Sequence, residues 1–319
     1  MSATSSWAAQ DINLRVGDVK GDRIVALRAS GELENLPYKL TIDTFASGAP
    51  VQEALNAGAL DVGLTGDLPF LFVYAAGAPV KAIDAWKNNP DSIALLTSQH
   101  STIHSLQDLK GKRIAVNRGG WGHYLILGLL ERAGLKPSDV TLNFLGPVDG
   151  RAALASGAVD AWAPWEPYVS SAIIQDKARL VPQGGGQGIM SGYSYVLARE
   201  TALSDADKRK AISDLLTRLA KAQVWAKQHP QQFAEALAKE LQFPLNVTQA
   251  WIADAQVSPV VFDKSIAATL QQSADFFHGY KVLPKAIDVA PAFDYGLAEG
   301  ANQVAKQFLA TSPKAEATP

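Results

Sequence analysis

Two stretches of this sequence repeat each other, and the repeat decides the predicted fold. Glu53–Asp67 reads EALNAGALDVGLTGD and Ala152–Glu166 reads AALASGAVDAWAPWE, with an offset of 99 residues between Ala54 and Ala153. The matching pairs are Ala54 and Ala153, Leu55 and Leu154, Gly58 and Gly157, Asp61 and Asp160, and Asp67 and Glu166. Each copy predicts a helix that ends at a glycine, then a short strand, then a helix that begins near an acid and a proline.

The match continues upstream of these stretches. Short β-type runs at Leu14–Gly17 and Arg113–Val116 each precede a basic residue, a glycine and a helical pattern, and second strands are predicted at Leu40–Phe45 and Val140–Leu145. Three successive strand–loop–helix units in each copy predict two lobes, each with a mostly parallel sheet flanked by helices. A cleft is then expected between the lobes, beyond the carboxyl ends of the strands. Chance similarity of two Ala/Gly-rich units is the alternative, and the spacing disfavours it.

The lobes are expected to be joined by two crossing segments. We expect residues 12–96 and 197–310 to form the first lobe and residues 97–196 the second, with crossings at Ile93–Thr97 and Tyr193–Ala198. Residues 1–11 and 311–319 are predicted to be disordered. Beyond Arg199 the sequence is helical, with Ser204 as a predicted N-cap, and we expect this part only to pack on the first lobe. Its predicted helices are Pro230–Leu241, Val247–Ala255, Ile266–His278 and Val289–Leu309.

Length and composition exclude several classes of protein. The 319 residues suggest about two domains, and 29 Lys and Arg against 31 Asp and Glu lack the basic excess of a nucleic-acid binder. The absence of cysteine excludes disulfides, thiol catalysis and Cys-based metal sites. No apolar run is long enough to span a bilayer. Met1–Gln10 lacks the features of a signal peptide, so we expect that a leader has been removed.

The loops at the predicted strand ends carry the candidate ligand-binding residues. Helix N-termini there offer free N–H groups and partial positive charge, glycines allow close approach, and basic and tryptophan side chains are concentrated in the same loops. These features predict a site for a small anion with an organic tail. The residues are Lys20, Gly21, Asp22 and Arg23; Ser47, Gly48 and Ala49; Thr65, Gly66 and Asp67; Asn117, Arg118, Gly119, Gly120, Trp121, Gly122 and His123; and Trp162, Trp165 and Glu166.

Several of these residues have a simpler interpretation. The basic residues could lie in solvated turns, and Trp162 and Trp165 could pack between the lobes. Asp67 and Glu166 would repel an anion, so they either cap their own helices, which we favour, or hold Arg23 or Arg118. His100 and His104 lack the glutamate of a metalloprotease motif and are interpreted as surface residues, and Gly184–Gly186 lacks the Lys-Ser/Thr of a P-loop. No metal or cofactor site is predicted.

Three segments resemble a known family of transport proteins. They are FASGAPVQEALNAGALDVGLTGDLP (45–69), DLKGKRIAVNRGGWGHYLILGLLERAGL (108–135) and DGRAALASGAVDAWAPWEPY (149–168), and LRVGDVKGD (14–22) matches the opening strand and Lys-Gly loop. The resemblance, over residues 12 to 240, is to the aliphatic-sulfonate-binding proteins of bacterial ABC importers, within the sulfonate/nitrate/taurine-binding family. The chain departs from this branch at 118–123, where glycine replaces a hydroxyl donor and a tryptophan is added.

The resemblance implies a type II periplasmic-binding-protein fold whose lobes close on a sulfonate by hinge motion. It also implies a periplasmic protein, with no cofactor, that delivers its ligand to a membrane permease for sulfur uptake; we expect a monomer. A sulfonate stays anionic and donates no proton, so its site should present only donors. We expect Gly48, Ala49, Thr65, Gly66, Asn117 and Gly120–Gly122 near the headgroup, Arg23 and Arg118 for charge, and Trp162, Trp165 and Tyr193 around the tail.

Other functions remain open at this stage. An enzyme like the pyrimidine synthase of thiamine biosynthesis, which uses the same fold, relies on a cysteine-rich motif that this chain lacks. The sensing domain of a transcription regulator would need a DNA-binding helix-turn-helix, and residues 1–13 are too short for one. Another organic anion is the third possibility: taurine, an aromatic sulfonate or sulfate ester, or nitrate, or a pyrimidine. Nitrate has no organic tail that could contact the tryptophan side chains.

Overall fold

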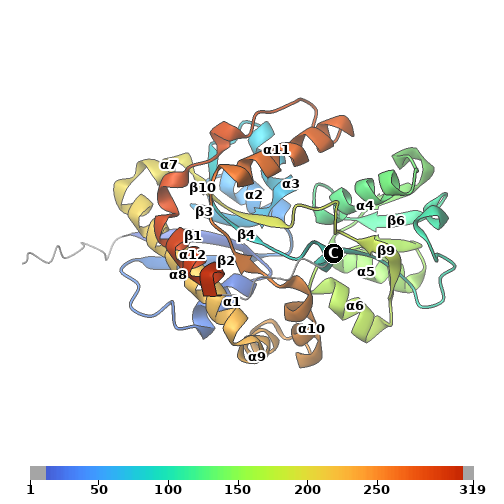
Figure 1. The fold of residues 1–319 in the computed structure, drawn as a ribbon, viewed down its shortest axis with the longest axis horizontal. Helices are drawn as coiled ribbons and strands as arrows, with labels where there is room; N and C mark the ends of the chain where they lie inside the picture. The colour runs from blue at the N-terminus through green and yellow to red at the C-terminus, as the bar shows by residue number, and fades with distance from the viewer. Residues whose placement is uncertain (1–11, 312–319) are drawn as a thin grey trace, which may run out of the picture.

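The computed structural model describes residues 12–311, and it places two β-sheets in two neighbouring lobes (Figure 1). The six-stranded sheet has the order β11-β4-β10-β3-β1-β2, and the five-stranded sheet has the order β7-β6-β8-β5-β9. The first sheet comprises β1 (Asn13–Val19), β2 (Lys39–Phe45), β3 (Val62–Gly66), β4 (Val80–Lys87), β10 (Tyr193–Arg199) and β11 (Ser258–Pro259). The second comprises β5 (Ala94–Thr97), β6 (Arg113–Val116), β7 (Thr141–Phe144), β8 (Ala161–Ala163) and β9 (Arg179–Gly185).

Each sheet is parallel except at the strand that arrives from the other lobe and, in the first sheet, at the two-residue edge strand β11, which is antiparallel to β4. Strands β1, β2 and β3 pair in parallel, and so do β6, β7 and β8, whereas β10 is antiparallel to β3 and β4, and β5 is antiparallel to β8 and β9. The chain therefore passes between the sheets at 88–93 and at 186–192. All of β5 belongs to the five-stranded sheet and all of β10 to the six-stranded sheet. The segments that we predicted as crossings, Ile93–Thr97 and Tyr193–Ala198, are therefore strands within the lobes, and the crossings precede these strands.

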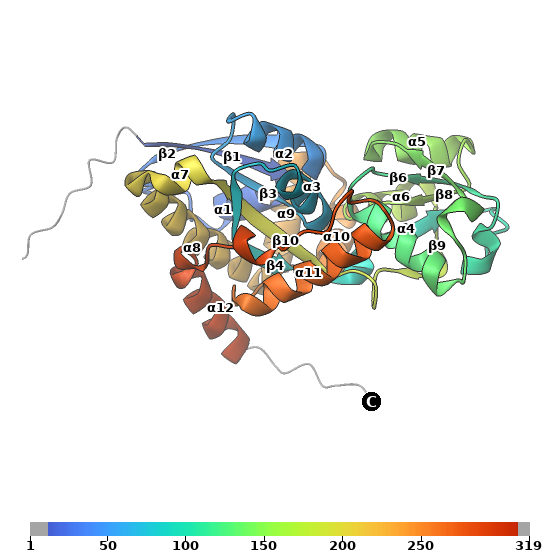
Figure 2. The ribbon, with the colours of Figure 1, turned by 90° about the horizontal axis from the view of Figure 1, so that it is seen from above.

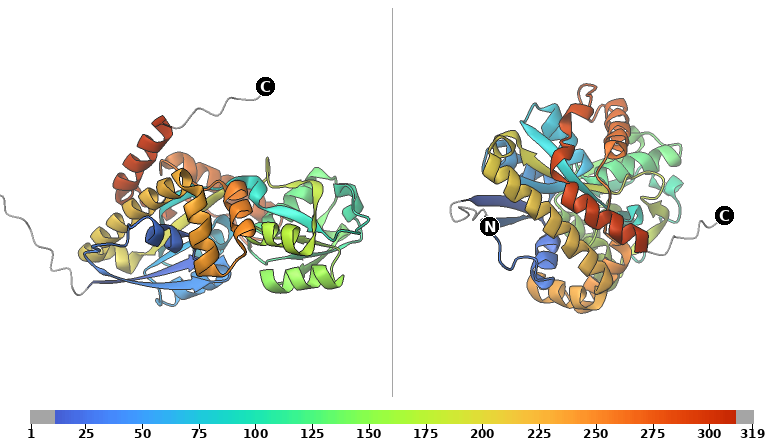
Figure 3. Two further views of the ribbon diagram at one scale, coloured as in Figure 1. Left: turned by 90° about the horizontal axis from the view of Figure 1, so that it is seen from below. Right: turned by 60° about the vertical axis from the view of Figure 1, so that its left-hand side comes forward.

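Helices flank both sheets, and the C-terminal ones are added mainly to the first lobe (Figures 1 and 2). In the two copies of the repeat they are α1 (Asp22–Ala29), α2 (Gly48–Asn56), α3 (Asp67–Ala75), α4 (Trp121–Arg132), α5 (Pro147–Ser156) and α6 (Tyr168–Asp176). The C-terminal part contributes α7 (Glu200–Ser204), α8 (Ala206–Gln228), α9 (Pro230–Leu241), α10 (Leu245–Ala255), α11 (Lys264–Gly279) and α12 (Glu299–Thr311). Figure 3 shows α12 lying along α8.

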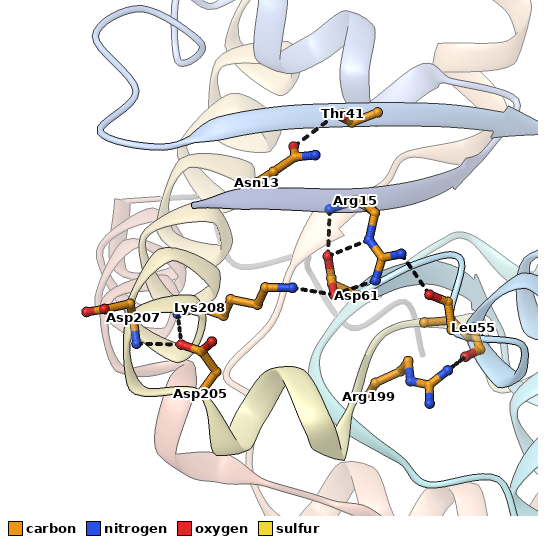
Figure 4. A network of polar contacts seen from close by, with 10 residues as sticks. Asn13, Arg15, Thr41, Leu55, Asp61, Arg199, Asp205, Asp207 and Lys208 are labelled. Carbon is orange, nitrogen blue, oxygen red and sulfur yellow. Dashed lines mark hydrogen bonds and ion pairs between the residues drawn. The ribbon is translucent and has the colours of Figure 1, made fainter. Parts of the chain in front are cut away.

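The repeat is preserved down to one side-chain interaction. In the first lobe, Arg15 donates from its backbone N, Nε and Nη2 to the Asp61 carboxylate and from Nη1 to the Gly58 carbonyl at 2.7 Å (Figure 4). In the second lobe, Arg113 makes the same set of bonds to Asp160 and to the carbonyl of Gly157, at 2.8 Å. The aspartates and glycines are those that the sequence repeat matched, so the two lobes have one local architecture.

Four details differ from the sequence predictions. The helix predicted at Val289–Leu309 begins only at Glu299, after two short 3-10 helices at Ala290–Ala292 and Tyr295–Leu297. Strand β4 and strand β9 were not predicted, and β9 covers part of the Gly-rich stretch around Gly184–Gly186. The N-cap of α8 is Asp205 instead of Ser204, because the Asp205 carboxylate accepts hydrogen bonds from the backbone N atoms of Asp207 and Lys208. Thr311, which we assigned to a disordered tail, ends α12. The other residues with predicted disorder lie outside the described residues.

The core is partly shared between the lobes. One cluster of buried side chains contains Leu68 and Phe70 of the first lobe together with Leu125 and Leu129 of the second. A second cluster lies between the first sheet and helices α1, α8, α9 and α10, and a third lies on the α5–α6 side of the second sheet. The C-terminal helices also touch the second lobe: Tyr280 donates from its hydroxyl to Glu131 of α4 at 3.0 Å.

Candidate ligand-binding cleft

A cavity of about 90 Å³ lies between the lobes, at the carboxyl ends of their parallel strands. Eleven of the predicted residues line it. They are Lys20, Asp22, Arg23, Gly48, Thr65 and Gly66 from the first lobe, and Asn117, Gly120, Trp121, Trp165 and Glu166 from the second. Both lobes therefore contribute to one site, as the repeat predicted.

Four helices begin at this cavity without a side-chain cap. The N-cap residues of α1, α2, α3 and α4 are Gly21, Ser47, Gly66 and Gly120, and none of them forms a side-chain hydrogen bond to its helix. Of the other helices, α8 and α11 are capped by Asp205 and Asp263, whereas the N-cap residues of α5, α6, α7, α9 and α10 form no such bond, so what distinguishes α1 to α4 is their convergence on one cavity. The first N–H groups of α1 to α4 carry partial positive charge and have no intrahelical acceptor. Their convergence from both lobes makes the cavity suitable for an anion.

Glycines let polar side chains approach these helix ends. A Cβ atom on Gly48 would lie 2.5 Å from Thr65 Oγ1, and one on Gly66 would lie 2.6 Å from Trp121 Nε1. Both distances are shorter than real Cβ contacts, so any larger residue would displace these side chains. The glycines of the predicted loops are thus required by packing at the cavity wall.

Thr65 has a hydroxyl that nothing in the described part of the chain satisfies. Its side chain lines the cavity and is only 4% exposed, and Oγ1 is buried without a hydrogen-bond partner among residues 12–311. A buried polar group without a partner costs about 1–3 kcal/mol. Such a group at a cavity wall is ready to donate to an acceptor that enters.

Arg23 supplies a fixed positive charge. Its Nη1 lies 2.9 Å from Asp22 and 3.9 Å from the fully buried Asp18, its Nη2 donates to Ser194 Oγ at 3.3 Å, and its guanidinium lies over the Trp86 ring. Burial, with the nearby Asp22 charge, raises the pKa of Asp18 to about 7, although Arg23 opposes that shift. The guanidinium is therefore held in place before any ligand arrives.

Lys20 reaches across the cleft. It takes a left-handed backbone conformation (φ 71°) in the loop before α1, and its ammonium contacts the hydroxyl of Tyr168 at the start of α6, 3.7 Å from the ring centroid. Burial lowers the pKa of Lys20 to about 8. The side chain thereby links the two lobes beside the cavity.

The two acids that seemed to oppose an anion are both engaged elsewhere. Asp67 is fully buried and does not line the cavity; its carboxylate accepts hydrogen bonds from Leu68 N, from Trp121 Nε1 of the other lobe at 3.0 Å, and from Ser191 Oγ at 3.1 Å. Burial raises its pKa to about 6. Its main role is to connect the lobes, which our capping interpretation missed, and neither Arg23 nor Arg118 is its partner.

Glu166 lines the cavity and also caps α6. It accepts hydrogen bonds from the backbone N of Ser170 at 3.2 Å and from Ser170 Oγ at 2.7 Å, in agreement with the capping interpretation. Burial raises its pKa to about 7, and the adjacent carboxyl of Asp254 on α10 contributes to this shift. At neutral pH a large share of this carboxyl is therefore uncharged, which reduces its repulsion of an anion.

Other predicted residues lie away from the cavity wall. The Arg118 guanidinium stacks on Phe144 at 3.7 Å from the ring centroid, and His123 meets the same ring edge-on. Burial, with Arg118 nearby, lowers the pKa of His123 to about 4. Trp162 is 2% exposed in the core of the second lobe, and Tyr193 lies beneath the Lys87 ammonium. The remaining predicted residues that do not line the cavity are Gly21, Ser47, Ala49, Gly119 and Gly122.

The C-terminal part of the chain completes the cavity, which corrects our expectation that it only packs on the first lobe. Trp251 and Ala255 of α10 and the following Val257 line the same wall as Arg23. The connecting segments and β10 add Asn88, Ser92 and Ser194. Nothing in the local pattern around Trp251 marks it as a site residue, because its role depends on where α10 packs.

Neither a metal centre nor a membrane span is found in residues 12–311. That range contains no group of three or more metal-ligating side chains able to hold an ion. His100 and His104 are exposed. Of the helices described, none has the length and apolar character needed to cross a bilayer.

The fold and cleft define a class of protein. Two α/β lobes joined by two crossing segments, with a cavity between them, form the type II periplasmic-binding-protein architecture, and this confirms the predicted fold. The model of the NMT1/THI5 like family matches residues 39–233, and the chain belongs to this family.

Sulfonate-binding proteins are among its most similar relatives. The periplasmic aliphatic sulphonate binding protein SsuA from Escherichia coli is 31% identical, with a TM-score of 0.79 over 88% of this chain and 92% of that chain. The alkanesulfonate-binding protein SsuA from Xanthomonas axonopodis pv. citri, bound to MOPS, is 31% identical, with a TM-score of 0.82 over 90% and 100%. A relative from Escherichia coli (strain K12), provisionally named as an aliphatic sulfonates-binding protein, is 34% identical over 283 residues, 86% of each chain. The resemblance stated from the sequence is confirmed.

Proposed function

We propose that this chain is the substrate-binding protein of an ABC importer and captures aliphatic sulfonates between its two lobes. The observation that carries the proposal is the convergence of four uncapped helix N-termini from both lobes on one cavity. A sulfonate has three acceptor oxygens, a permanent negative charge and no proton to donate. Free N–H groups, the hydroxyl of Thr65 and the guanidinium of Arg23 suit that headgroup.

The organic part of the ligand also has complementary surfaces. Trp165 of the second lobe and Trp251 of the first line the cavity, and Leu64 and Val257 add apolar wall. Indole rings bury a large apolar area, which inorganic sulfate or nitrate cannot use. This favours an alkyl sulfonate over a simple oxyanion, and the names of the relatives agree with it.

Contacts between the lobes suggest how binding is coupled to closure. Trp121 of α4 donates to Asp67 of α3, and Lys20 contacts Tyr168, so both walls of the cleft are tied to each other beside the ligand. We propose that ligand stabilises this closed arrangement and that the closed form docks on a membrane permease in the periplasm as a monomer, for sulfur uptake. The ligand then shifts the equilibrium only by its preference for the closed state. We propose no enzymatic activity.

Taurine is the second candidate, because an acid lies in the same cavity. Glu166 lines the wall beside Trp165, and the ammonium of taurine would give its carboxylate a partner. A ligand of this kind would favour the ionised form of Glu166, whereas an alkanesulfonate would favour the neutral form. The two candidates therefore differ in the sign of their pH dependence around pH 7.

A thermal-shift panel tests the proposal. Alkanesulfonates, taurine, an aromatic sulfonate, a sulfate ester, sulfate and nitrate are each added to the purified protein, and a ligand at 100 times its Kd should stabilise it by about 2.7 kcal/mol. We expect the largest shift with an alkanesulfonate. A shift with nitrate or sulfate and none with any sulfonate would overturn the proposal, and isothermal titration of taurine at pH 6 and pH 8 separates the second candidate.

A further inference from the structure

A second cavity lies next to the candidate cleft, inside the first lobe. It has a volume of about 230 Å³, is lined by residues of α8, α9 and α10, which lie together in Figure 1, and opens to solvent beside the exposed Pro230, Ala253 and Gln256. Asp22, Trp251, Ala255 and Val257 line both cavities. The two cavities are therefore neighbours, and Trp251 is the largest residue that lines both.

The walls of the second cavity are apolar. Phe233 and Leu237 of α9 and Ala226 of α8 belong to the buried core of the first lobe, and the half-buried Ile252 of α10 lines the cavity but not the cleft. These side chains offer dispersion contacts and no hydrogen bonds. A guest in this space must be an apolar group.

The polar groups of this cavity already have partners. Gln223 Nε2 donates to the carbonyl of Val257 at 3.1 Å, and Lys227 Nζ donates to Ser258 Oγ at 2.7 Å and to the Gln256 carbonyl at 3.3 Å. The one acid in the lining, Asp22, is paired with Arg23. A charged or strongly polar guest would have to break these bonds, whereas an alkyl chain would not.

We propose that the second cavity holds the far end of the alkyl tail of a long-chain sulfonate whose headgroup occupies the cleft, an inference that rests on the proposed function. The N-terminus of α1 opens on both spaces through Asp22, so a tail that leaves a headgroup at the helix ends meets Trp251 and Ala255 next. Ala255 is small and leaves the Trp251 indole as the main barrier. The second cavity is the adjacent space that a longer tail meets beyond these two shared residues.

Titration calorimetry with linear alkanesulfonates tests the inference on the unmodified protein. Ethane-, butane-, hexane- and octanesulfonate are compared below their micelle-forming concentrations. Each methylene that leaves water should lower Kd about fourfold, and we expect this decrease to continue to octanesulfonate. A Kd that stops falling beyond butanesulfonate would overturn the inference. The absence of binding by any of the four sulfonates would instead overturn the proposed function, so the two failures are distinguishable.

Variants of α10 locate the tail. Ile252→Trp fills the second cavity without touching the cleft, and we expect it to raise the Kd of octanesulfonate at least tenfold while that of ethanesulfonate stays unchanged. Leu245→Trp is the matched control, because Leu245 is exposed on the same helix and lines neither cavity. An equal loss of affinity for both ligands in Ile252→Trp, or an unchanged affinity for octanesulfonate, would contradict the assignment. Should that variant fold poorly, the chain-length series decides the question alone.

Discussion

Replacing Thr65 with valine should stabilise the ligand-free protein. The hydroxyl is buried against the cleft, has no partner in residues 12–311, and belongs to a side chain that is 4% exposed. Burying an unsatisfied hydroxyl costs about 1–3 kcal/mol, and valine keeps the shape of threonine without that group. We therefore expect a gain of about 1 kcal/mol in the free energy of unfolding, which corresponds to a rise of about 2 °C in Tm.

The same substitution should weaken sulfonate binding. A hydrogen bond from a neutral hydroxyl to a charged oxygen contributes about 1.5–3 kcal/mol, and valine leaves that oxygen without its donor. The expected increase in Kd is about 10-fold to 150-fold. Thr65→Ser keeps the donor, so it should retain most of the affinity while losing the packing of one methyl group.

Differential scanning fluorimetry without ligand and calorimetry with butanesulfonate measure the two effects separately. Thr97→Val is the matched control, because Thr97 is fully buried and its Oγ1 donates to the Asp160 carbonyl at 3.0 Å, away from the cleft. We expect that control to lower Tm and leave Kd unchanged. If Thr65→Val instead behaved like Thr97→Val in both assays, the Thr65 hydroxyl would be structural, and the argument would be refuted.

Three further substitutions test other parts of the structure. Trp121→Phe removes the hydrogen bond from the indole to Asp67 that connects the lobes. We expect a Kd about 3- to 30-fold higher, because a hydrogen bond to a charged group is lost only in the closed form. An unchanged Kd by calorimetry would contradict this role of Trp121. Asp61→Asn should lower the free energy of unfolding by about 3–5 kcal/mol in a urea titration, because the Asp61 side chain is 4% exposed and accepts from an arginine and a lysine. Its repeat partner Asp160 is 31% exposed, so Asp160→Asn should lower it by about 1 kcal/mol or less. Equal losses in the two variants would contradict this difference. Glu166→Gln should reduce the fall of Tm that accompanies rising pH. Burial raises the pKa of Glu166 from 4.5 to about 7, so the folded chain keeps a proton that the unfolded chain releases, and this group's contribution to stability is lost as pH rises between about 4.5 and 7. Melting curves at pH 5 and pH 8 measure the effect, and an unaltered fall of Tm would show that another group titrates.

Helix ends were the most predictable part of the fold. The sequence placed helix stops at Gly58 and Gly157, and these glycines take positive φ angles of 79° and 73°. A left-handed residue at a helix end favours glycine because a Cβ atom is strained there, although α6, α9 and α10 end at Lys177, Gln242 and Gln256 in the same conformation. This constraint is local, so one sequence is enough to detect it.

Strands β4 and β9 were not predictable in the same way. β4 and β9 hold equivalent places in the two sheets, 99 residues apart, but they lie beyond the stretches whose sequences match, and β9 (RLVPQGG) contains a proline and two glycines, which are typical of loops. In the structure β9 is an edge strand that pairs only with β5, where a missing N–H donor is tolerated. Pairing partners decide such cases, and the sequence alone does not show them.

The tryptophans show why site residues are harder to assign than loops. Trp162 lies on β8 between Ala161 and Ala163, and side chains alternate across a strand. The alanines face the core shared between the lobes, so Trp162 must face α5 and α6. Trp165 follows the end of the strand and lines the cleft. Trp251 arrives from a helix nearly one hundred residues away, where only the tertiary packing of α10 brings it to the site.

The treatment of acids in the cleft argues for an anionic ligand more strongly than any single donor does. The negative charges of Asp67, Asp22 and Glu166, at or beside the cavity, are each reduced or compensated in a different way. Asp67 accepts hydrogen bonds outside the cavity, and Asp22 forms an ion pair with Arg23. Burial raises the pKa of Glu166 to about 7. The helix ends at the same place lack side-chain caps, although a cap contributes about 0.5–2 kcal/mol of stability. Helix ends without caps and acids with compensated charge make the ligand-free protein less stable. An anion that enters the cavity restores part of this stability, because it accepts hydrogen bonds from the unsatisfied donors of both lobes at once. The same hydrogen bonds therefore stabilise both the bound ligand and the closed form, which explains why the donors come from both sides of the cleft.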